Sequence, residues 1–328
     1  MLDVSEPTTI ELDNNVEVLA VSVSNAISSG SYLPNNVIGL SQNDLWEKGH
    51  ICVILIGGSI ECWGSNNYGQ LGDGTNIDKD GPTPVLMGNM ENLVKMVSGE
   101  LSCALYDLGS VECWGTDTTQ LNWDGTTSNS DNYQTRQFNL DLPAIDIDGG
   151  GHSMCAILEN YSVVCWGDNR AGQLGDGSSV KWSNDSVYVS LPVGRTATSI
   201  SVSQEGACAV LDNNSLVCWG GNWNGQLGDG TYTNSNQPVF VNSWGFFDNS
   251  EVEITKVSKG TSHTCATYIG FNETITGSGT YGDNFLACWG QGFYGQLGNG
   301  LTMHGEGSSN PGFNGSSTPV LGVNWGQE

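Results

Sequence analysis

Short runs of alternating apolar and polar residues recur along the chain, bounded by Gly, Asn and Asp. In residues 208–218, for example, two short apolar runs that each contain a β-branched valine flank the polar stretch Asp-Asn-Asn-Ser. Apolar runs on either side of a short turn are typical of a β-hairpin. The pattern therefore predicts antiparallel hairpins at regular intervals.

Two further strands accompany each predicted hairpin. A short segment follows it at 83–86, 237–241 and 318–321. A fourth, alternating segment leads into the next hairpin at 93–98, 197–203 and 252–258, and residues 16–24 supply this strand ahead of the first hairpin. Four antiparallel strands in about 50 residues match the size of a propeller blade. We predict an all-β chain with five complete blades.

The tripeptide Cys-Trp-Gly marks each repeat. It begins at Cys62, Cys113, Cys165, Cys218 and Cys288, and a second cysteine precedes each copy at Cys52, Cys103, Cys155, Cys208 and Cys265. In the first four units nine residues separate the pair, so a three-residue turn would place the two cysteines directly opposite each other. Such a turn favours a left-handed residue at its last position. Gly58, Gly109 and Asn214 suit that position, whereas Tyr161 does not.

A glycine-rich motif follows each Cys-Trp-Gly. Gly-Gln-Leu-Gly-Asp-Gly begins at Gly69, Gly172 and Gly225, a variant with Asn begins at Gly295, and a degraded copy occupies 120–125. Together these motifs resemble the regulator of chromosome condensation repeats, over roughly residues 50–325. The resemblance implies a β-propeller, usually of seven blades, whereas this chain shows five.

We expect one propeller domain over residues 1–328. Residues 1–25 form a lead-in with the first inner strand, and 26–49 form a loop insertion. The repeat units are expected at about 50–98, 99–150, 151–203, 204–258 and 259–328.

The charge balance excludes several classes of partner. Nine Lys and Arg residues oppose 35 Asp and Glu residues, for a net charge of -26. Nucleic-acid binding and attachment to anionic membranes both require basic residues. No apolar run approaches the 18 residues of a membrane span. We therefore expect no nucleic-acid partner and no direct membrane insertion.

Cysteine usage indicates the compartment. One even pair per blade favours cross-strand disulfides, which accumulate in oxidising compartments. Zinc binding, the alternative, would need CxxC-type spacing and four converging ligands. The disulfide interpretation predicts an extracellular or cell-surface protein, with the signal peptide absent from this chain. Five sequons are compatible with export, at Asn160, Asn184, Asn213, Asn272 and Asn314.

Few residues suggest catalysis or metal binding. No nucleophile elbow, phosphate loop or zinc-hydrolase motif is present, so we expect no enzyme activity. Asp73, Asp78 and Asp80 offer hard oxygens at near spacing, so calcium binding is one interpretation. In the other, the Asp of each glycine-rich motif bonds its own turn. Three of the four His fall at or next to one repeat position, which favours a structural role.

Variable loop residues are the best candidates for binding. With strands lettered A to D outward, the A–B and C–D loops share one face and the B–C turns the other. Exposed aromatics at loop tips usually contact a partner, although these rings could instead fold back onto neighbouring blades. The candidates on the A–B and C–D face are Tyr32, Trp46, Tyr68, Trp223, Phe293 and Tyr294.

The sequence thus predicts a non-catalytic extracellular or cell-surface module for recognition or adhesion, which binds a protein partner through one loop face. The sequons at Asn160, Asn213 and Asn272 fall on the other face. A secreted inhibitor of β-lactamases in the similar family uses a loop face in this way, whereas the family's chromatin role requires bases that are missing here. The alternative is a lectin-like propeller that stacks sugars on its Trp and Tyr rings.

Overall fold

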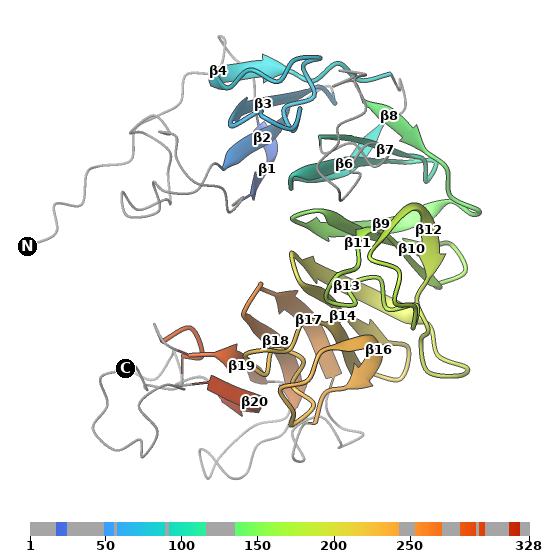
Figure 1. The fold of residues 1–328 in the computed structure, drawn as a ribbon, viewed down its shortest axis with the longest axis vertical. Helices are drawn as coiled ribbons and strands as arrows, with labels where there is room; N and C mark the ends of the chain where they lie inside the picture. Colours follow the sequence, from blue (N-terminus) through green and yellow to red (C-terminus); the bar gives the residue numbers. More distant parts are fainter. Residues whose placement is uncertain are drawn as a thin grey trace, which may run out of the picture. The chain divides into compact units, whose positions relative to one another are not determined.

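The computed structural model describes residues 18–24, 49–55, 58–88, 92–115, 135–242, 253–270, 283–292, 295–298 and 315–321. These ranges contain five four-stranded sheets, here called blades 1 to 5 (Figure 1). The chain divides into two compact units: Met1–Pro143 with Gly150–His152, and Ala144–Gly149 with Ser153–Glu328. The first unit contains blades 1 and 2 and the second contains blades 3 to 5. The expectation of one propeller domain stays a prediction.

The first unit contains eight of the strands. Blade 1 comprises β1 (Val18–Ser24), β2 (His50–Leu55), β3 (Ile60–Gly64) and β4 (Lys79–Pro84). Blade 2 comprises β5 (Leu93–Val97), β6 (Leu101–Tyr106), β7 (Val111–Gly115) and β8 (Arg136–Phe138).

The second unit contains the other three blades. Blade 3 comprises β9 (Ala144–Gly150, whose last residue belongs to the first unit), β10 (Ser153–Leu158), β11 (Val163–Asp168) and β12 (Trp182–Tyr188). Blade 4 comprises β13 (Ala197–Ser203), β14 (Gly206–Leu211), β15 (Leu216–Gly220) and β16 (Ser235–Phe240). Blade 5 comprises β17 (Glu253–Lys259), β18 (His263–Gly270), β19 (Asp283–Gln291) and β20 (Gly315–Leu321).

In every blade the four strands pair in chain order and antiparallel, as the sequence predicts. We keep the letters A to D for the first to fourth strand of each blade. The A–B and C–D loops therefore leave one end of each sheet and the B–C turns leave the other.

The fourth strands begin earlier than predicted. The structure places β4 at Lys79–Pro84, where the sequence pattern indicates 83–86. Strand β3 pairs with β4 on both sides of an irregularity, through Gly64 with Lys79 and Cys62 with Thr83. The early half of β4 is polar and partly exposed, so it carries no apolar signal.

All ten cysteines form the five predicted disulfides. Each pair joins directly opposed residues of strands B and C, as Cys155 faces Cys165 and Cys208 faces Cys218. The bridges are Cys52–Cys62, Cys103–Cys113, Cys155–Cys165, Cys208–Cys218 and Cys265–Cys288. No cysteine of the chain is free.

The last turn residue is left-handed in all four short hairpins, including the one that ends in tyrosine. Tyr161 has φ of 62°, close to the 63° of Asn214. A left-handed non-glycine residue costs about 1–2 kcal/mol. The Tyr161 backbone is held by bonds from its N–H to Leu158 O (2.7 Å) and from Ala197 N–H to its carbonyl (3.0 Å). Hydrogen bonding within and beyond the hairpin therefore overrides the local preference.

The tryptophan of each Cys-Trp-Gly is buried, as predicted. Three of these indoles donate to the glycine-rich loop of the preceding blade: Trp114 to Gln70 O (3.0 Å), Trp219 to Gln173 O (2.8 Å) and Trp289 to Gln226 O (3.0 Å). A Cβ on Gly175, whose φ is +66°, would lie 2.7 Å from the Trp219 Nε1 atom. The recurrent motif therefore joins successive blades within a unit.

Candidate binding surface at the A–B and C–D loop ends

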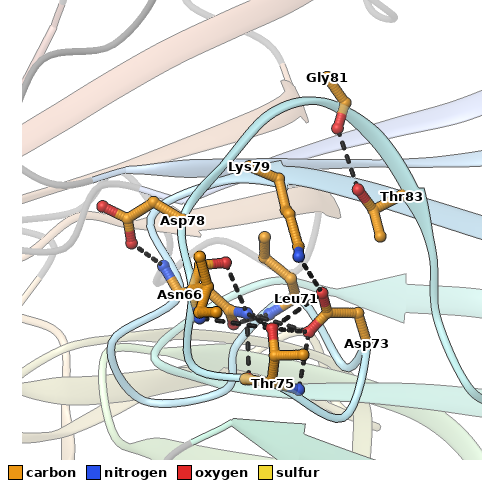
Figure 2. A network of polar contacts seen from close by, with 9 residues as sticks. Asn66, Leu71, Asp73, Thr75, Asp78, Lys79, Gly81 and Thr83 are labelled. Atoms are coloured by element: carbon orange, nitrogen blue, oxygen red, sulfur yellow. Dashed lines mark hydrogen bonds and ion pairs between the residues drawn. The ribbon is translucent and has the colours of Figure 1, made fainter.

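A buried asparagine organises the C–D loop of blade 1 (Figure 2). The Asn66 Nδ2 group donates to Asp73 Oδ1 (3.0 Å) and Thr75 O (3.0 Å), and Asn66 Oδ1 accepts from Leu71 N–H (2.9 Å). Asn222 makes the corresponding contacts in blade 4, with Asp229, Thr231 and Leu227. These bonds hold the loop backbone rigid while the tip residues stay free to vary.

The motif aspartates bond their own turns. Asp73 Oδ1 accepts from Thr75 N–H (2.9 Å), and its Oδ2 forms an ion pair with Lys79 (3.1 Å, Figure 2). Burial acts to raise the pKa of Asp73, but hydrogen bonds from Thr75, Lys79 and Asn66 outweigh it and hold the pKa below its ordinary value.

Calcium binding by Asp73, Asp78 and Asp80 stays a prediction. Asp78 Oδ1 accepts from Asn66 N–H (2.8 Å), so two of the three carboxylates already have protein partners. Among the described residues, no group of three or more His, Cys, Asp or Glu side chains is placed to hold a metal ion.

In the first unit, Tyr68 lies against a histidine and a carboxylate. The Tyr68 and His152 rings meet edge to face, with centroids 6.4 Å apart and planes at 82°. His152, in the turn between β9 and β10, forms an ion pair through Nε2 with the buried Glu100 of the β5–β6 turn. Sequence reasoning assigned His152 a structural role and did not single out Glu100. The signal that could have marked the pair is a shared repeat position, because Glu100 and His152 each lie three residues before the first cysteine of their blade.

His50 is a core histidine, as expected. It is fully buried, and its Nε2 lies 3.4 Å from the Ser102 hydroxyl. Burial lowers the pKa of His50 to about 4, so the ring is neutral at physiological pH.

In the second unit, the charges of a carboxylate and a buried amine act on each other near the A–B loop ends of blades 4 and 5. Glu205 lies in the β13–β14 turn, and Lys259, the last residue of β17, is buried with its Nζ 3.5 Å from Gln226 O. Burial raises the pKa of Glu205 against the opposing effect of the Lys259 charge. Burial lowers the pKa of Lys259 to about 7, although Glu205 acts to raise it. Burial, followed by the Lys259 charge, lowers the pKa of His263.

Of the six predicted binding residues, two are described and both are exposed. Trp223 is 66% exposed in the β15–β16 loop, and Tyr68 is 40% exposed in the β3–β4 loop. These loops belong to different units. The other four predicted residues lie outside the described ranges: Tyr32, Trp46, Phe293 and Tyr294.

Three sequon asparagines are described, and all are exposed: Asn160, Asn184 and Asn213. Asn160 and Asn213 occupy the B–C turns of blades 3 and 4, as predicted, whereas Asn184 lies in β12. Asn272 and Asn314 lie outside the described ranges.

Comparison with known proteins identifies the repeat. The family model of the regulator of chromosome condensation (RCC1) repeat matches residues 58–105 and 214–267. These two segments carry the RCC1 repeat. The RCC1-repeat chain is 28% identical over 223 residues to the human E3 ubiquitin-protein ligase HERC2, an alignment that spans 66% of the chain and only 4% of HERC2.

Solved structures show the same fold. Human WBSCR16 superposes on the RCC1-repeat chain with a TM-score of 0.65 and 17% identity, covering 95% of this chain and 82% of WBSCR16. Prp20p from Saccharomyces cerevisiae, described with its binding to Gsp1p and histones, gives a TM-score of 0.62 and 18% identity over 84% of this chain and 61% of Prp20p. The RCC1-repeat chain is therefore an all-β propeller of four-stranded blades. Its described part has no helix with the length and apolarity needed to cross a membrane.

Proposed function

We propose that the chain is a non-catalytic, extracellular or cell-surface recognition module that binds a protein partner through its A–B and C–D loop ends. The observation that carries the proposal is Trp223, an indole that is 66% exposed on a rigid loop. Exposed aromatics on preorganised loops are the residues that dominate protein interfaces.

The loop around Trp223 is preorganised by its neighbours. Asn222 accepts from Leu227 N–H (2.9 Å), and Asn224 N–H donates to Gln226 Oε1 (2.9 Å). A partner that binds here would therefore order few additional torsions, which lowers the entropic cost of association.

Two observations support the rest of the proposal. Five disulfides with no free cysteine are typical of an oxidising compartment. Prp20p, which shares the fold, binds other proteins, namely Gsp1p and histones. We carry over from it only the class of partner.

A lectin-like function is the second candidate, because an exposed indole also stacks well on sugar rings. The neighbouring amide of Asn224 is partly exposed and could accept or donate to sugar hydroxyls.

The test measures binding of the fluorescently labelled chain to a panel of intact cells, before and after surface proteolysis or glycosidase treatment. Trp223→Ala should weaken binding by about 2 kcal/mol, or roughly 30-fold. The matched control is Tyr161→Ala, an exposed aromatic at a B–C turn, which should bind normally. Loss of binding after proteolysis supports a protein partner, and loss only after glycosidase treatment supports the lectin. Loss with Tyr161→Ala and normal binding with Trp223→Ala would overturn the assignment of the loop end.

A further inference from the structure

The residue directly before the glycine-rich motif differs between two loops that share one backbone arrangement. Tyr68 precedes Gly69, and Ala171 precedes Gly172. Each donates its backbone N–H to the glutamine two residues on, Tyr68 to Gln70 Oε1 (2.9 Å) and Ala171 to Gln173 Oε1 (2.8 Å). The first loop therefore presents a phenol ring at a place where the second presents a methyl group.

A carboxylate occurs at one repeat position beside both loops. Glu100 and Glu205 each lie three residues before the first cysteine of their blade. In the first unit Tyr68 packs against His152, the partner of Glu100. In the second unit Gln173 Nε2 donates to Gln204 O (3.2 Å), so the loop of Ala171 lies beside the turn of Glu205.

Glu205 also contacts a second small residue, Gly221, in the loop that carries Trp223. Gly221 N–H donates to Glu205 O (2.7 Å), and a Cβ on Gly221 would lie 3.0 Å from Glu205 Oε2. The carboxylate therefore extends over Gly221. Trp223 follows two residues later, within about 7 Å along the chain. Ala171 and Gly221 thus place small residues in the two loops beside Glu205, and the exposed Trp223 lies two residues from Gly221.

We propose that this surface, made of Ala171, Glu205, Gly221 and Trp223, binds a cationic side chain of the protein partner, with arginine favoured. The proposal rests on the proposed function, because it names the chemistry that the partner presents to Trp223. A guanidinium can stack on an indole and donate two hydrogen bonds to a carboxylate at once. Lysine fits less well, because its ammonium is a point charge.

Charge complementarity supports a cationic partner. The chain carries a net charge of -26, which attracts basic partners over a long range. Lys259, whose charge acts on Glu205, is buried with its Nζ near Gln226 O, so it cannot cover the outer side of Glu205. Arg170, next to Ala171, forms an ion pair with Asp168 (2.7 Å). His263 of β18 is the other titratable group near Lys259. The backbone N–H of Lys259 donates to Ser201 Oγ of β13 (3.0 Å).

The test uses N-acetyl-arginine amide as the probe and the neutral isostere N-acetyl-citrulline amide as its control. Binding is followed through the Trp223 indole N–H resonance of the full chain at low salt. We expect a saturable shift with a dissociation constant on the order of millimolar, about 4 kcal/mol, and at least tenfold weaker binding of the citrulline probe.

Variants locate the site. Glu205→Gln should weaken arginine binding at least fivefold, and Ala171→Tyr should abolish it by supplying the ring that Tyr68 supplies in the first unit. One matched control is Glu253→Gln, which removes a carboxylate charge from the end of β17 opposite Lys259. The other is Phe240→Ala, which removes an exposed aromatic ring from β16, the edge strand of blade 4. Both should bind within twofold of the unmodified chain.

Equal binding of the arginine and citrulline probes by the unmodified chain would overturn the proposal, and this result does not depend on any variant folding. A larger Trp223 shift with chitotriose than with either probe would favour the lectin instead. If the arginine probe fails while cell binding still depends on Trp223 and on surface protein, the proposed function stands and only the cationic chemistry is wrong.

Discussion

The loops of Tyr68 and Ala171 show how one scaffold produces a closed and an open loop end. Both loops have the same glycine-rich motif, the same buried asparagine contact and the same N–H bond to a glutamine. They differ at two tip positions, which hold Asn67 and Tyr68 in the first loop and Arg170 and Ala171 in the second. Because the backbone is held by hydrogen bonds that do not involve the tip side chains, these positions can change without disturbing the blade.

The carboxylates beside these loops also differ in their surroundings. Glu100 is buried, and its partner His152 is the partly exposed member of the ion pair. Glu205 is partly exposed, and Lys259, whose charge acts on it, is buried. The same repeat position therefore holds a carboxylate in both units, but the carboxylate is buried in one unit and partly exposed in the other. The partly exposed carboxylate, Glu205, is the one available to a partner.

The largest expected effect tests whether the disulfide contributes equally to the stability of one blade in each unit. Replacing both cysteines of blade 2 (Cys103→Ala with Cys113→Ala) or of blade 4 (Cys208→Ala with Cys218→Ala) should lower the free energy of unfolding by about 2.8 kcal/mol in each case, from loss of loop-closure entropy. Urea titration measures both. A difference above about 1.5 kcal/mol between the two variants would show that the blades are not equivalent.

The next largest effects come from two substitutions, one expected to lower the stability of the fold and the other to raise it. His152→Ala removes the partner of the buried Glu100 and should destabilise the fold by about 1–3 kcal/mol. Lys259→Met removes an amine that is costly to bury in its charged form, so it should raise the melting temperature at pH 6.

The pH dependence of the stability checks the expected direction of the Lys259→Met effect. Its pKa is about 7 in the folded chain and about 10.4 when unfolded, so the unfolded chain binds more protons between these values. The unmodified chain therefore gains stability from this group as the pH rises from 7 to about 10.4. The advantage of Lys259→Met should be greatest below pH 7 and smaller at pH 9. A larger advantage at pH 9 than at pH 6, measured by thermal melts, would contradict the burial of this amine.

The smallest effects separate a ring that packs from a ring that is free to bind. Tyr68→Ala should cost about 1 kcal/mol, because the phenol packs against His152. Trp223→Ala should change the free energy of unfolding by less than about 0.5 kcal/mol, because 66% of the residue is exposed. Chemical denaturation of both variants provides the measurement, and equal costs would remove the distinction between the two loops.

Several features of the fold could be predicted because they depend on near neighbours in the sequence. The nine-residue separation of Cys208 and Cys218 determines that they oppose each other in a hairpin, and the structure confirms it. The early half of β4 could not be predicted in this way, since its residues pair beyond an irregularity and face solvent. Tyr161 adopts a left-handed conformation that its type disfavours, because a bond from Ala197 of the next blade helps to hold it.

The same distinction between near and distant neighbours in the sequence applies to the candidate site. Trp223 could be predicted from its place in a variable loop, and it is exposed as expected. The pairing of Glu100 with His152 and the electrostatic effect of Lys259 on Glu205 could not, because 52 and 54 residues separate the members.

The sequence by itself determined the blades: their four strands, their disulfides and the motif that joins one blade to the next. These features repeat because each depends on contacts within a hairpin or between one motif and the next indole. Only the tertiary structure decided which loop-end charges meet and which rings stay exposed. Those outcomes depend on how one turn is oriented toward the turn of the next blade, and a shift of a few ångströms there makes or breaks an ion pair.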